Sequence, residues 1–172
     1  MGDSRKIVKK YSTPHHPWKA ERIEEEKGLQ KEFGLKNKRE IWKTESMLRR
    51  IRRQARKTLA ARTEQEKKEE EQLLKRLIRL KVVKDDATPD DILALDTKDL
   101  LGRRLQTLVY KRGLANTIMH ARQLITHGHI SIKGRKVTSP GHLVSAEEED
   151  SIGLYNYTPG KAQLKTKIKG ES

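Results

Sequence analysis

Hydrophobic positions in the first 96 residues recur at helical spacing, with long charged stretches between them. From residue 41 onward their spacings are seven, three, four and four, which predicts one apolar side of an amphipathic helix over residues 37–61. That side consists of Ile41, Leu48, Ile51, Ala55 and Leu59. An earlier helix is expected to begin at Pro17 and run to about Phe33. Proline fits a first helical turn, and Gly34 suits a helix end.

Three shorter elements are expected between residues 63 and 96. The mixed-charge stretch 63–72 predicts an exposed helix or connector, and a Leu-rich helix should follow it. The apolar positions of that second helix are Leu73, Leu74, Leu77, Ile78 and Leu80. Residues 85–88 then form a turn, and Pro89 starts a helical turn. Asp96 is suited to cap the next helix, with Asp99 favouring its positive end.

From residue 97 the apolar pattern predicts two helices in a compact unit. The first is expected to present a single apolar face and to end at Gly113. The face comprises Leu100, Leu101, Leu105, Leu108 and Val109. The second helix, capped by Asn116 or Thr117, should end at Gly128. Its inward positions are Ile118, Ala121, Leu124 and Ile125.

Short strands should complete this unit. Ile130 and Ile132 alternate with polar residues, which predicts a strand that turns at Lys133 and Gly134. Further short strands are expected around turns at residues 139–141 and 147–150. They would be supplied by Val137, Leu143, Val144, Ile152 and Leu154. The fold class is therefore α+β: a basic helical region with an extended arm, followed by a compact two-helix and short-strand unit.

Three regions are expected along the chain. Residues 1–96 would form the basic arm and helical region, and residues 97–157 the compact unit. Residues 158–172 carry many lysines and no packing signal, so we expect a tail that is ordered only on a partner. The prolines at 14 and 17 favour an extended segment at the amino-terminal end.

Charge identifies the class of partner. The 172 residues carry a net charge of +15 and a pI near 10, which points to a polyanion whose counterions are released on binding. Cysteine is absent, so neither a disulfide framework nor a Cys-ligated metal site can form. No apolar run approaches the ~20 residues that span a bilayer. A soluble, intracellular protein that binds a polyanion is the expectation.

Basic residues are densest in the predicted helix over 37–61. Eleven occur between residues 36 and 62, opposed only by Glu40 and Glu45. Like charges at this density repel one another unless a polyanion lies beside them. We therefore interpret the helix as contacting RNA phosphates, the alternative being a solvated basic face. The candidate RNA-binding residues here are Lys36, Lys38, Arg39, Arg49, Arg50, Arg52, Arg53 and Arg56.

A second group of candidates remains once the apolar positions of the compact unit are set aside. Arginine can hold a phosphate in a bidentate way, and Asn, Gln and Thr can bond sugar and phosphate oxygens. The candidates are Arg103, Arg104, Thr107, Lys111, Asn116, Thr117, His120, Arg122, Gln123, His127, Lys133, Arg135 and Lys136. We expect Arg104, Arg122 and Gln123 to be exposed, opposite the buried leucines. Phe and Trp platforms for stacking bases are nearly absent, which argues against a reader of single strands.

Other chemistry has little support in the sequence. His15, His16, His120, His127 and His129 lack the spacing of a metal site, so no metal or other cofactor is expected. The acidic run at 24–26 is interpreted as a solvated or cation-paired face. We find no catalytic triad pattern, P-loop or dinucleotide-binding motif, and we expect no enzymatic activity.

Several motifs in the compact unit resemble a known RNA-binding domain. They are R-L-x-x-x-V-x-x-x-G at 104–113, A-R-Q-L-I at 121–125 and I-x-I-x-G-x-x-V at 130–137. Together they resemble the RNA-binding domain named after the S-four family of small-subunit ribosomal proteins, over roughly residues 103–154. Segments 11–18 (YSTPHHPW), 33–42 (FGLKNKREIW) and 100–107 (LLGRRLQT) resemble the archaeal and eukaryotic branch of that family, and the short tail favours an archaeal source.

The resemblance implies a primary rRNA-binding protein at a helical junction in the 5′ domain of small-subunit rRNA. Such a protein would nucleate assembly of the subunit body. It would lie near the path by which mRNA enters, beside the S-five family protein, at an interface associated with decoding accuracy. The zinc of many bacterial members is not implied, because the cysteine cluster is missing. Rival interpretations are a stand-alone RNA-binding stress factor, an enzyme carrying this module and a generic DNA-compacting protein.

Overall fold

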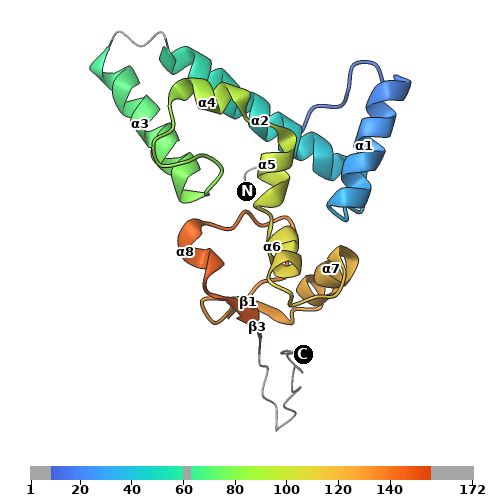
Figure 1. The fold of residues 1–172 in the computed structure, drawn as a ribbon. Helices are drawn as coiled ribbons and strands as arrows, with labels where there is room; N and C mark the ends of the chain where they lie inside the picture. The colour runs from blue at the N-terminus through green and yellow to red at the C-terminus, as the bar shows by residue number, and fades with distance from the viewer. Residues whose placement is uncertain (1–8, 60–62, 156–172) are drawn as a thin grey trace, which may run out of the picture.

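The computed structural model describes residues 9–59 and 63–155, and its elements form two parts joined end to end (Figure 1). The upper part is entirely helical. It contains α1 (Ala20–Glu32), α2 (Lys38–Leu59), α3 (Glu64–Arg79), α4 (Pro89–Ala94) and α5 (Thr97–Gly102). The lower part contains α6 (Leu105–Lys111), α7 (Ile118–Thr126), β1 (Ile130–Ile132), β2 (Arg135–Lys136), α8 (Ala146–Glu149) and β3 (Ile152–Leu154). This arrangement confirms the α+β class.

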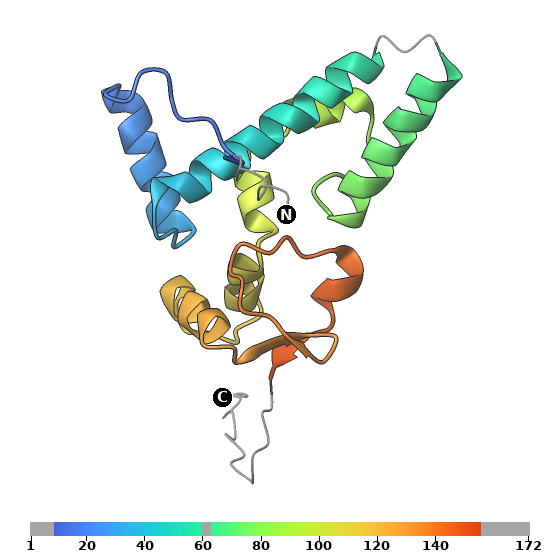
Figure 2. The same ribbon diagram turned by 180° about the vertical axis from the view of Figure 1, so that it is seen from behind.

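Helix α2 is the central helix of the upper part, and α1, α3, α4 and α5 all pack against it (Figure 2). Its predicted apolar side is buried at Ile41, Leu48, Ile51 and Ala55. Leu59 was placed on that side wrongly, because it is exposed. Thr58 is buried instead, and its hydroxyl donates to the carbonyls of Gln54 and Ala55. A threonine can therefore be buried at a helix end, because its hydroxyl forms a hydrogen bond with a backbone carbonyl of the preceding turn.

Two upper elements differ from their predictions. α1 begins at Ala20 rather than at Pro17, because the Arg22 guanidinium bonds the carbonyls of His16 and Pro17 and Lys19 is extended. Residues 64–79 form one continuous helix, so the stretch at 63–72, expected as an exposed helix or connector, is helical and joins the Leu-rich helix without a break. A capping box between Thr63 and Glu66 starts it. The helix start predicted at Pro89 and the cap predicted at Asp96 are confirmed.

The single helix expected from residue 97 to Gly113 is broken at Arg103 and Arg104. Arg104 is extended, at φ −73° and ψ 145°, and its backbone bridges Leu143. The Leu105 amide donates to the His142 carbonyl over 2.8 Å. This pairing with a distant loop separates α5 from α6 and rotates their apolar faces apart. Leu100 and Leu101 consequently pack in the upper cores, whereas Leu105 packs in the lower core.

The lower part packs α6 and α7 beside a three-stranded antiparallel sheet in the order β2-β1-β3. Ile132 pairs with Arg135 across the predicted turn and with Ile152 on the other side. Leu143 forms only an isolated bridge, and neither Val137 nor Val144 lies in a strand. Residues 146–149 form α8 rather than part of a turn, because a capping box between Ser145 and Glu148 starts a helix there.

Candidate nucleic-acid interface

The exposed side of α2 carries the densest group of cations in the upper part. Six candidates from this region are exposed, as predicted: Lys36, Arg39, Arg49, Arg50, Arg53 and Arg56. They are available to a polyanion because the buried side of the helix is occupied by its own core. None of the candidate RNA-binding residues on this surface comes from α1 or α3.

The amino-terminal arm lies along α2. The Ser12 amide donates to Ser46 Oγ over 3.1 Å, and Arg49 Nη1 donates to Ser12 Oγ over 3.0 Å. Arg50 Nη2 donates to the Lys10 carbonyl over 3.4 Å. The arm therefore adds Lys9 and Lys10, both exposed, to the basic surface of the helix.

Two further candidates on this helix, Lys38 and Arg52, are half-buried against partners within the chain. Lys38 Nζ lies 2.9 Å from Oε2 of the buried Glu26, and Arg52 Nη2 donates to the Leu95 carbonyl. Glu26 also accepts a hydrogen bond from Trp42 Nε1 at 3.0 Å and pairs with Arg22. Burial raises the pKa of Glu26, but bonds from Trp42 and Lys38 outweigh it and leave the pKa lowered.

The lower part presents a second exposed polar surface. Thr117 caps α7 by accepting a bond from the His120 amide, which confirms one of its two predicted caps. His120 itself is half-buried. The candidates that are exposed here are Lys111, Asn116, Thr117, Gln123, His127, Lys133, Arg135 and Lys136. They lie on α6, at the two ends of α7, on α7 itself and on the hairpin.

The prediction that Arg104 and Arg122 are exposed is wrong. Their side chains are 7% and 17% exposed, and both bind the carboxylate of Glu40 on α2. Arg104 Nη2 lies 2.6 Å from Glu40 Oε2, and Arg122 Nη2 lies 2.7 Å from Oε1. Arg122 Nη1 also donates to Gln106 Oε1 over 3.3 Å. The upper and lower parts are held together by these contacts.

Thr107 and Arg103 were also interpreted wrongly as surface residues. Thr107 is buried, and its hydroxyl donates to the Leu101 carbonyl over 2.9 Å. Arg103 is largely covered, and its Nη2 lies 3.0 Å from Glu149 Oε2 and 3.3 Å from the Val144 carbonyl. The break between α5 and α6 turns both side chains inward, so a projection onto one continuous helix misplaced them.

Glu40 and Gln106 hold this junction together through hydrogen bonds that the sequence did not reveal. Burial raises the pKa of Glu40, but hydrogen bonds from Arg122 and Arg104 outweigh it, so the pKa lies below its ordinary value. Gln106 is fully buried, and its Nε2 donates to the carbonyls of Gly34 and Ile118. The one available signal was that Glu40 is an acid in a strongly basic stretch.

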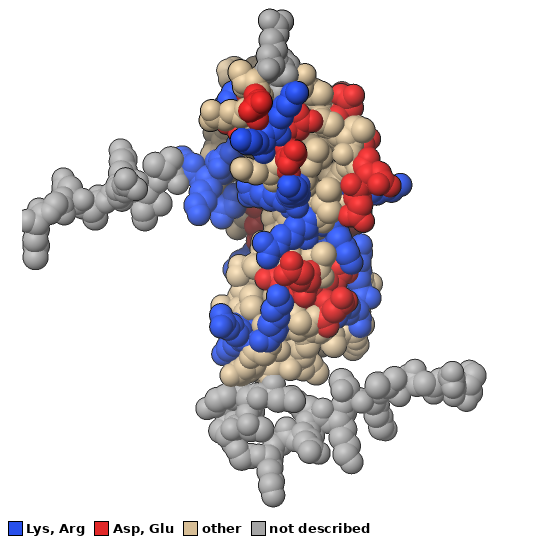
Figure 3. Space-filling model, turned by 90° about the vertical axis from the view of Figure 1, so that its left-hand side faces the viewer, with Lys and Arg blue, Asp and Glu red and all other residues tan. Residues whose placement is uncertain are grey.

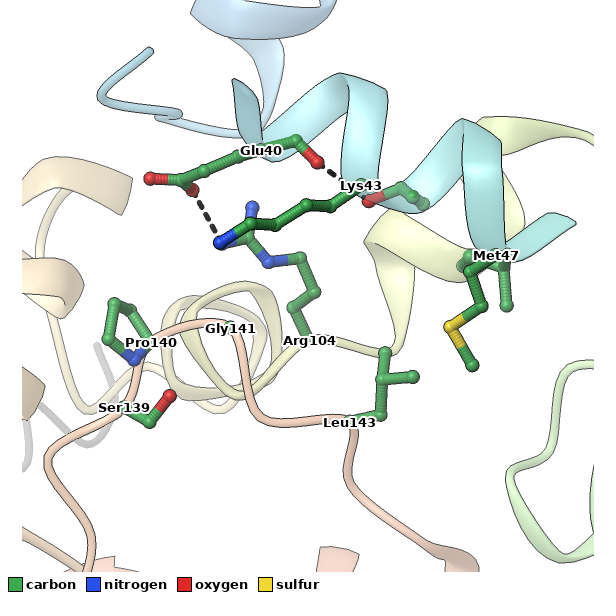
Figure 4. Close-up of a pocket in the computed structure, with 10 residues that line it drawn as sticks. Glu40, Lys43, Met47, Arg104, Ser139, Pro140, Gly141 and Leu143 are labelled. Atoms are coloured by element: carbon green, nitrogen blue, oxygen red, sulfur yellow. Dashed lines mark hydrogen bonds and ion pairs between the residues drawn. The ribbon is translucent and has the colours of Figure 1, made fainter. Parts of the chain in front are cut away.

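A small pocket lies beside this junction, between α2 and the loop at 139–143 (Figure 4). In Figure 4, Glu40 and Lys43 come from α2, while Ser139 and Gly141 come from the loop. Arg104 lies between them. Its Nη1 atom is buried and has no hydrogen-bond partner among the described residues. The charged side chains that line the pocket are Lys43, Arg104 and Glu40, and the last two are bonded to each other.

Acidic side chains form clusters of their own on one face of the molecule, and those of α8 are paired with cations of neighbouring elements. On the face seen in Figure 3, Lys and Arg form a band across the middle of the molecule, with separate acidic clusters above and below it. The residues of α8 account for several ion pairs with neighbouring elements. Glu147 pairs with Arg79 and Lys133, and Glu149 pairs with Lys81 and Arg103. The carboxylates of these acids are therefore paired with basic side chains of the lower part and of the end of α3.

Neither a metal centre nor a membrane span is found in the described parts of the chain. Residues 9–59 and 63–155 contain no group of three or more His, Cys, Asp or Glu side chains that could hold an ion. His127 and His129 stack at a ring-centroid distance of 6.4 Å, as a pair only. No helix in these ranges is long and apolar enough to cross a membrane.

A long basic helix with its arm, joined to a small two-helix and three-strand unit with a second polar surface, defines a nucleic-acid-binding protein without a catalytic centre in its described residues. The S4 domain family matches residues 103–150, and the family described as ribosomal protein S4/S9 N-terminal domain matches residues 2–102. The chain therefore belongs to the ribosomal protein S4/S9 family.

Relatives match along nearly the full length of the chain. The small ribosomal subunit protein uS4 of Ignicoccus hospitalis is 57% identical over 159 residues, which cover 92% of this chain and 96% of the relative. The protein of the same name from Methanothermobacter thermautotrophicus is 52% identical over 164 residues, covering 95% and 96%. That of Saccharolobus solfataricus is 52% identical over 156 residues, covering 90% and 86%. The resemblance to the archaeal branch is confirmed.

Proposed function

We propose that this protein is a structural constituent of the small ribosomal subunit and binds rRNA directly, with no catalytic step. Its relatives carry the name small ribosomal subunit protein uS4, and both of its parts match families of ribosomal or S4-type proteins. The role places it in the cytoplasmic ribosome.

The observation that carries the proposal is the exposed cationic side of α2, with the arm packed along it. Arg53 and Arg56 are exposed, and no ion pair joins either to another described residue. Unpaired arginines at this density are stabilised by phosphate. Because side chains cannot enter the deep major groove of A-form RNA, such a surface reads backbone shape and 2′-hydroxyls. A helical junction in the 5′ domain of small-subunit rRNA is the site we propose.

The finer assignments are also proposals. By its resemblance to the S-four family, the protein would nucleate assembly of the subunit body and contact the S-five family protein. The same resemblance favours a place near the path by which mRNA enters and an influence on decoding accuracy. The division of the chain at residues 96/97 and the separate tail from residue 158 are proposals as well. The tail lies outside the described residues.

Binding to folded RNA tests the proposal. A junction-containing fragment of small-subunit rRNA should bind far more tightly than a simple RNA duplex of equal length at the same salt concentration. Equal affinities for the two RNAs would mean that the protein binds RNA as a non-specific polycation. In cell extracts, co-sedimentation with small subunits through a moderate-salt gradient distinguishes a ribosomal constituent from a stand-alone RNA-binding stress factor, which would remain near the top.

A further inference from the structure

Trp18 is an unusually exposed aromatic side chain for a folded segment. It is 88% exposed, and no described residue makes a hydrogen bond or ring contact with it. Tryptophan is highly buried on average, since covering its ring removes a large apolar area from water. Trp42, the other tryptophan, follows that rule: it is half-buried and bonded to Glu26. The exposed indole therefore suggests a partner.

The bend that carries Trp18 is held in place. Arg22 Nη2 donates to the carbonyls of His16 and Pro17, each over 3.0 Å. Arg22 Nη1 lies 3.3 Å from Oε1 of Glu26, which is buried. A chain of contacts thus runs from a buried carboxylate to the residue immediately before Trp18. Pre-organisation of this kind lowers the entropy lost when a side chain binds.

The surroundings of Trp18 favour a nucleic acid as the partner. The described arm before it carries Lys9 and Lys10 and no acidic residue, whereas Lys19, which follows it directly, pairs with Glu21 over 3.2 Å. Arg49 and Arg50 anchor the same arm to α2. An RNA backbone that follows this basic surface would bring its bases within reach of the indole. A flat, π-bearing side chain beside bound phosphates is the arrangement used to stack unpaired bases.

We propose that Trp18 is a stacking platform for one unpaired nucleobase of the bound RNA. This inference rests on the proposed rRNA-binding function and specifies one of its contacts. The scarcity of Phe and Trp argued against a reader of single strands, and this inference assigns a single base contact to one of the few aromatic side chains. The arm then supplies a base contact, while the α2 surface supplies phosphate contacts.

Fluorescence tests the contact directly because the chain has two tryptophans. In a Trp42→Phe variant Trp18 is the sole indole. The junction RNA should quench its emission strongly, whereas heparin, a polyanion without bases, should not. If Trp42→Phe does not fold, the difference between the emission of the natural chain and that of Trp18→Phe gives the same information. Unchanged Trp18 emission in the saturated RNA complex would overturn the inference.

Affinity gives a second test. Trp18→Leu keeps an apolar side chain without a ring, and should weaken binding of the junction RNA by roughly 5- to 100-fold, the range of base-stacking contributions. Trp18→Phe should recover most of that loss, and the salt dependence should be unchanged because no charge is removed. Tyr110→Leu, which removes a ring that is 46% exposed on α6, is the matched control and should bind as the natural chain does.

The two proposals can fail separately. If the natural chain prefers the junction RNA but Trp18→Leu binds it equally well, the stacking inference falls and the proposed function stands. If Trp18 stays exposed with RNA and is quenched only when a neighbouring ribosomal protein is added, its partner is a protein and the inference again falls. If the natural chain shows no preference for junction RNA, the proposed function itself fails.

Discussion

Glu40 and Arg122, 82 residues apart in the chain, form two hydrogen bonds of 2.7 and 3.2 Å. Glu40 lies in the first turn of α2 and Arg122 in α7, so the pair joins the upper part to the lower. Arg104 binds the same carboxylate from the break between α5 and α6. One acidic side chain therefore neutralises two largely covered guanidinium groups and fixes the relative position of the two candidate RNA-binding surfaces.

Replacing Glu40 with Gln should destabilise the protein substantially. Removal of one partner leaves two arginines unpaired, and breaking a buried pair costs ~3–5 kcal/mol. Because one amide oxygen can still accept a hydrogen bond, we expect a decrease of roughly 2–4 kcal/mol in the free energy of unfolding, measured with urea. Glu24→Gln, at an exposed position of α1, is the control and should change it by less than about 0.5 kcal/mol. A similarly small change for Glu40→Gln would mean that the two parts are held together by other contacts.

The Glu40 contribution should depend on pH in a defined direction. Burial raises its pKa, but the bonds from Arg122 and Arg104 prevail, so its pKa in the folded state lies below the ordinary 4.5. A group with a lowered folded pKa stabilises the fold fully above its unfolded pKa and loses that effect as the pH falls through the folded value. The difference in unfolding free energy between the natural chain and Glu40→Gln should thus be constant from pH 7 to about pH 5.5. This difference should become smaller as the pH falls below the ordinary pKa of Glu40. A difference that grows on acidification would contradict the assigned direction.

Gly34 should be intolerant of any side chain. Its φ is +58°, and a Cβ atom there would lie 2.8 Å from both Gln106 Nε2 and Ile118 Cγ2. Gly34→Ala should therefore cost about 2 kcal/mol or more, from left-handed strain of ~1–2 kcal/mol and from displacement of the buried Gln106. Gly28→Ala is the matched control: nothing lies within 4 Å of its Cβ position in α1, so it should stabilise by about 0.5–1 kcal/mol. Thermal unfolding of both variants tests the contrast, and a neutral Gly34→Ala would show that the contact can relax.

Local patterns sufficed for some parts of this fold and failed at the junction. The helical spacing of apolar residues in α2 can be recognised from the sequence of that helix alone. Its buried face was therefore predictable, apart from Leu59. The exposure of Gln123 was predicted correctly, but that of Arg122, its neighbour on α7, was not. Their difference depends on Glu40, which no helical period connects to α7. Likewise the turn at Arg104 is fixed by pairing with Leu143, a contact between residues far apart in sequence. Side-chain directions at the junction were therefore set by tertiary contacts that override the pattern.

The cationic surface of α2 should determine how binding responds to salt. Arg53 and Arg56 are exposed and make no ion pair with a described residue, so each is free to replace a counterion on a phosphate. The double change of Arg53 and Arg56 to Gln should lower the slope of log affinity against log salt by roughly 0.7–0.9 per lost contact, with folded RNA taken as similar to single strands and B-DNA. Its unfolding free energy should change by less than ~1 kcal/mol, as is usual for surface residues.

Arg52→Gln provides the contrast on the same helix. Its guanidinium is half-buried and bonds the Leu95 carbonyl at the end of α4, so this change should reduce stability by about 1–3 kcal/mol. It should alter the salt slope less than either exposed arginine does, because its charge faces α4. Titrations of junction RNA at several salt concentrations, with urea unfolding in parallel, separate the two effects. Were Arg52→Gln to flatten the slope while Arg53 and Arg56 left it unchanged, the RNA would lie over α4, and the phosphate-binding face of α2 would have to be reassigned.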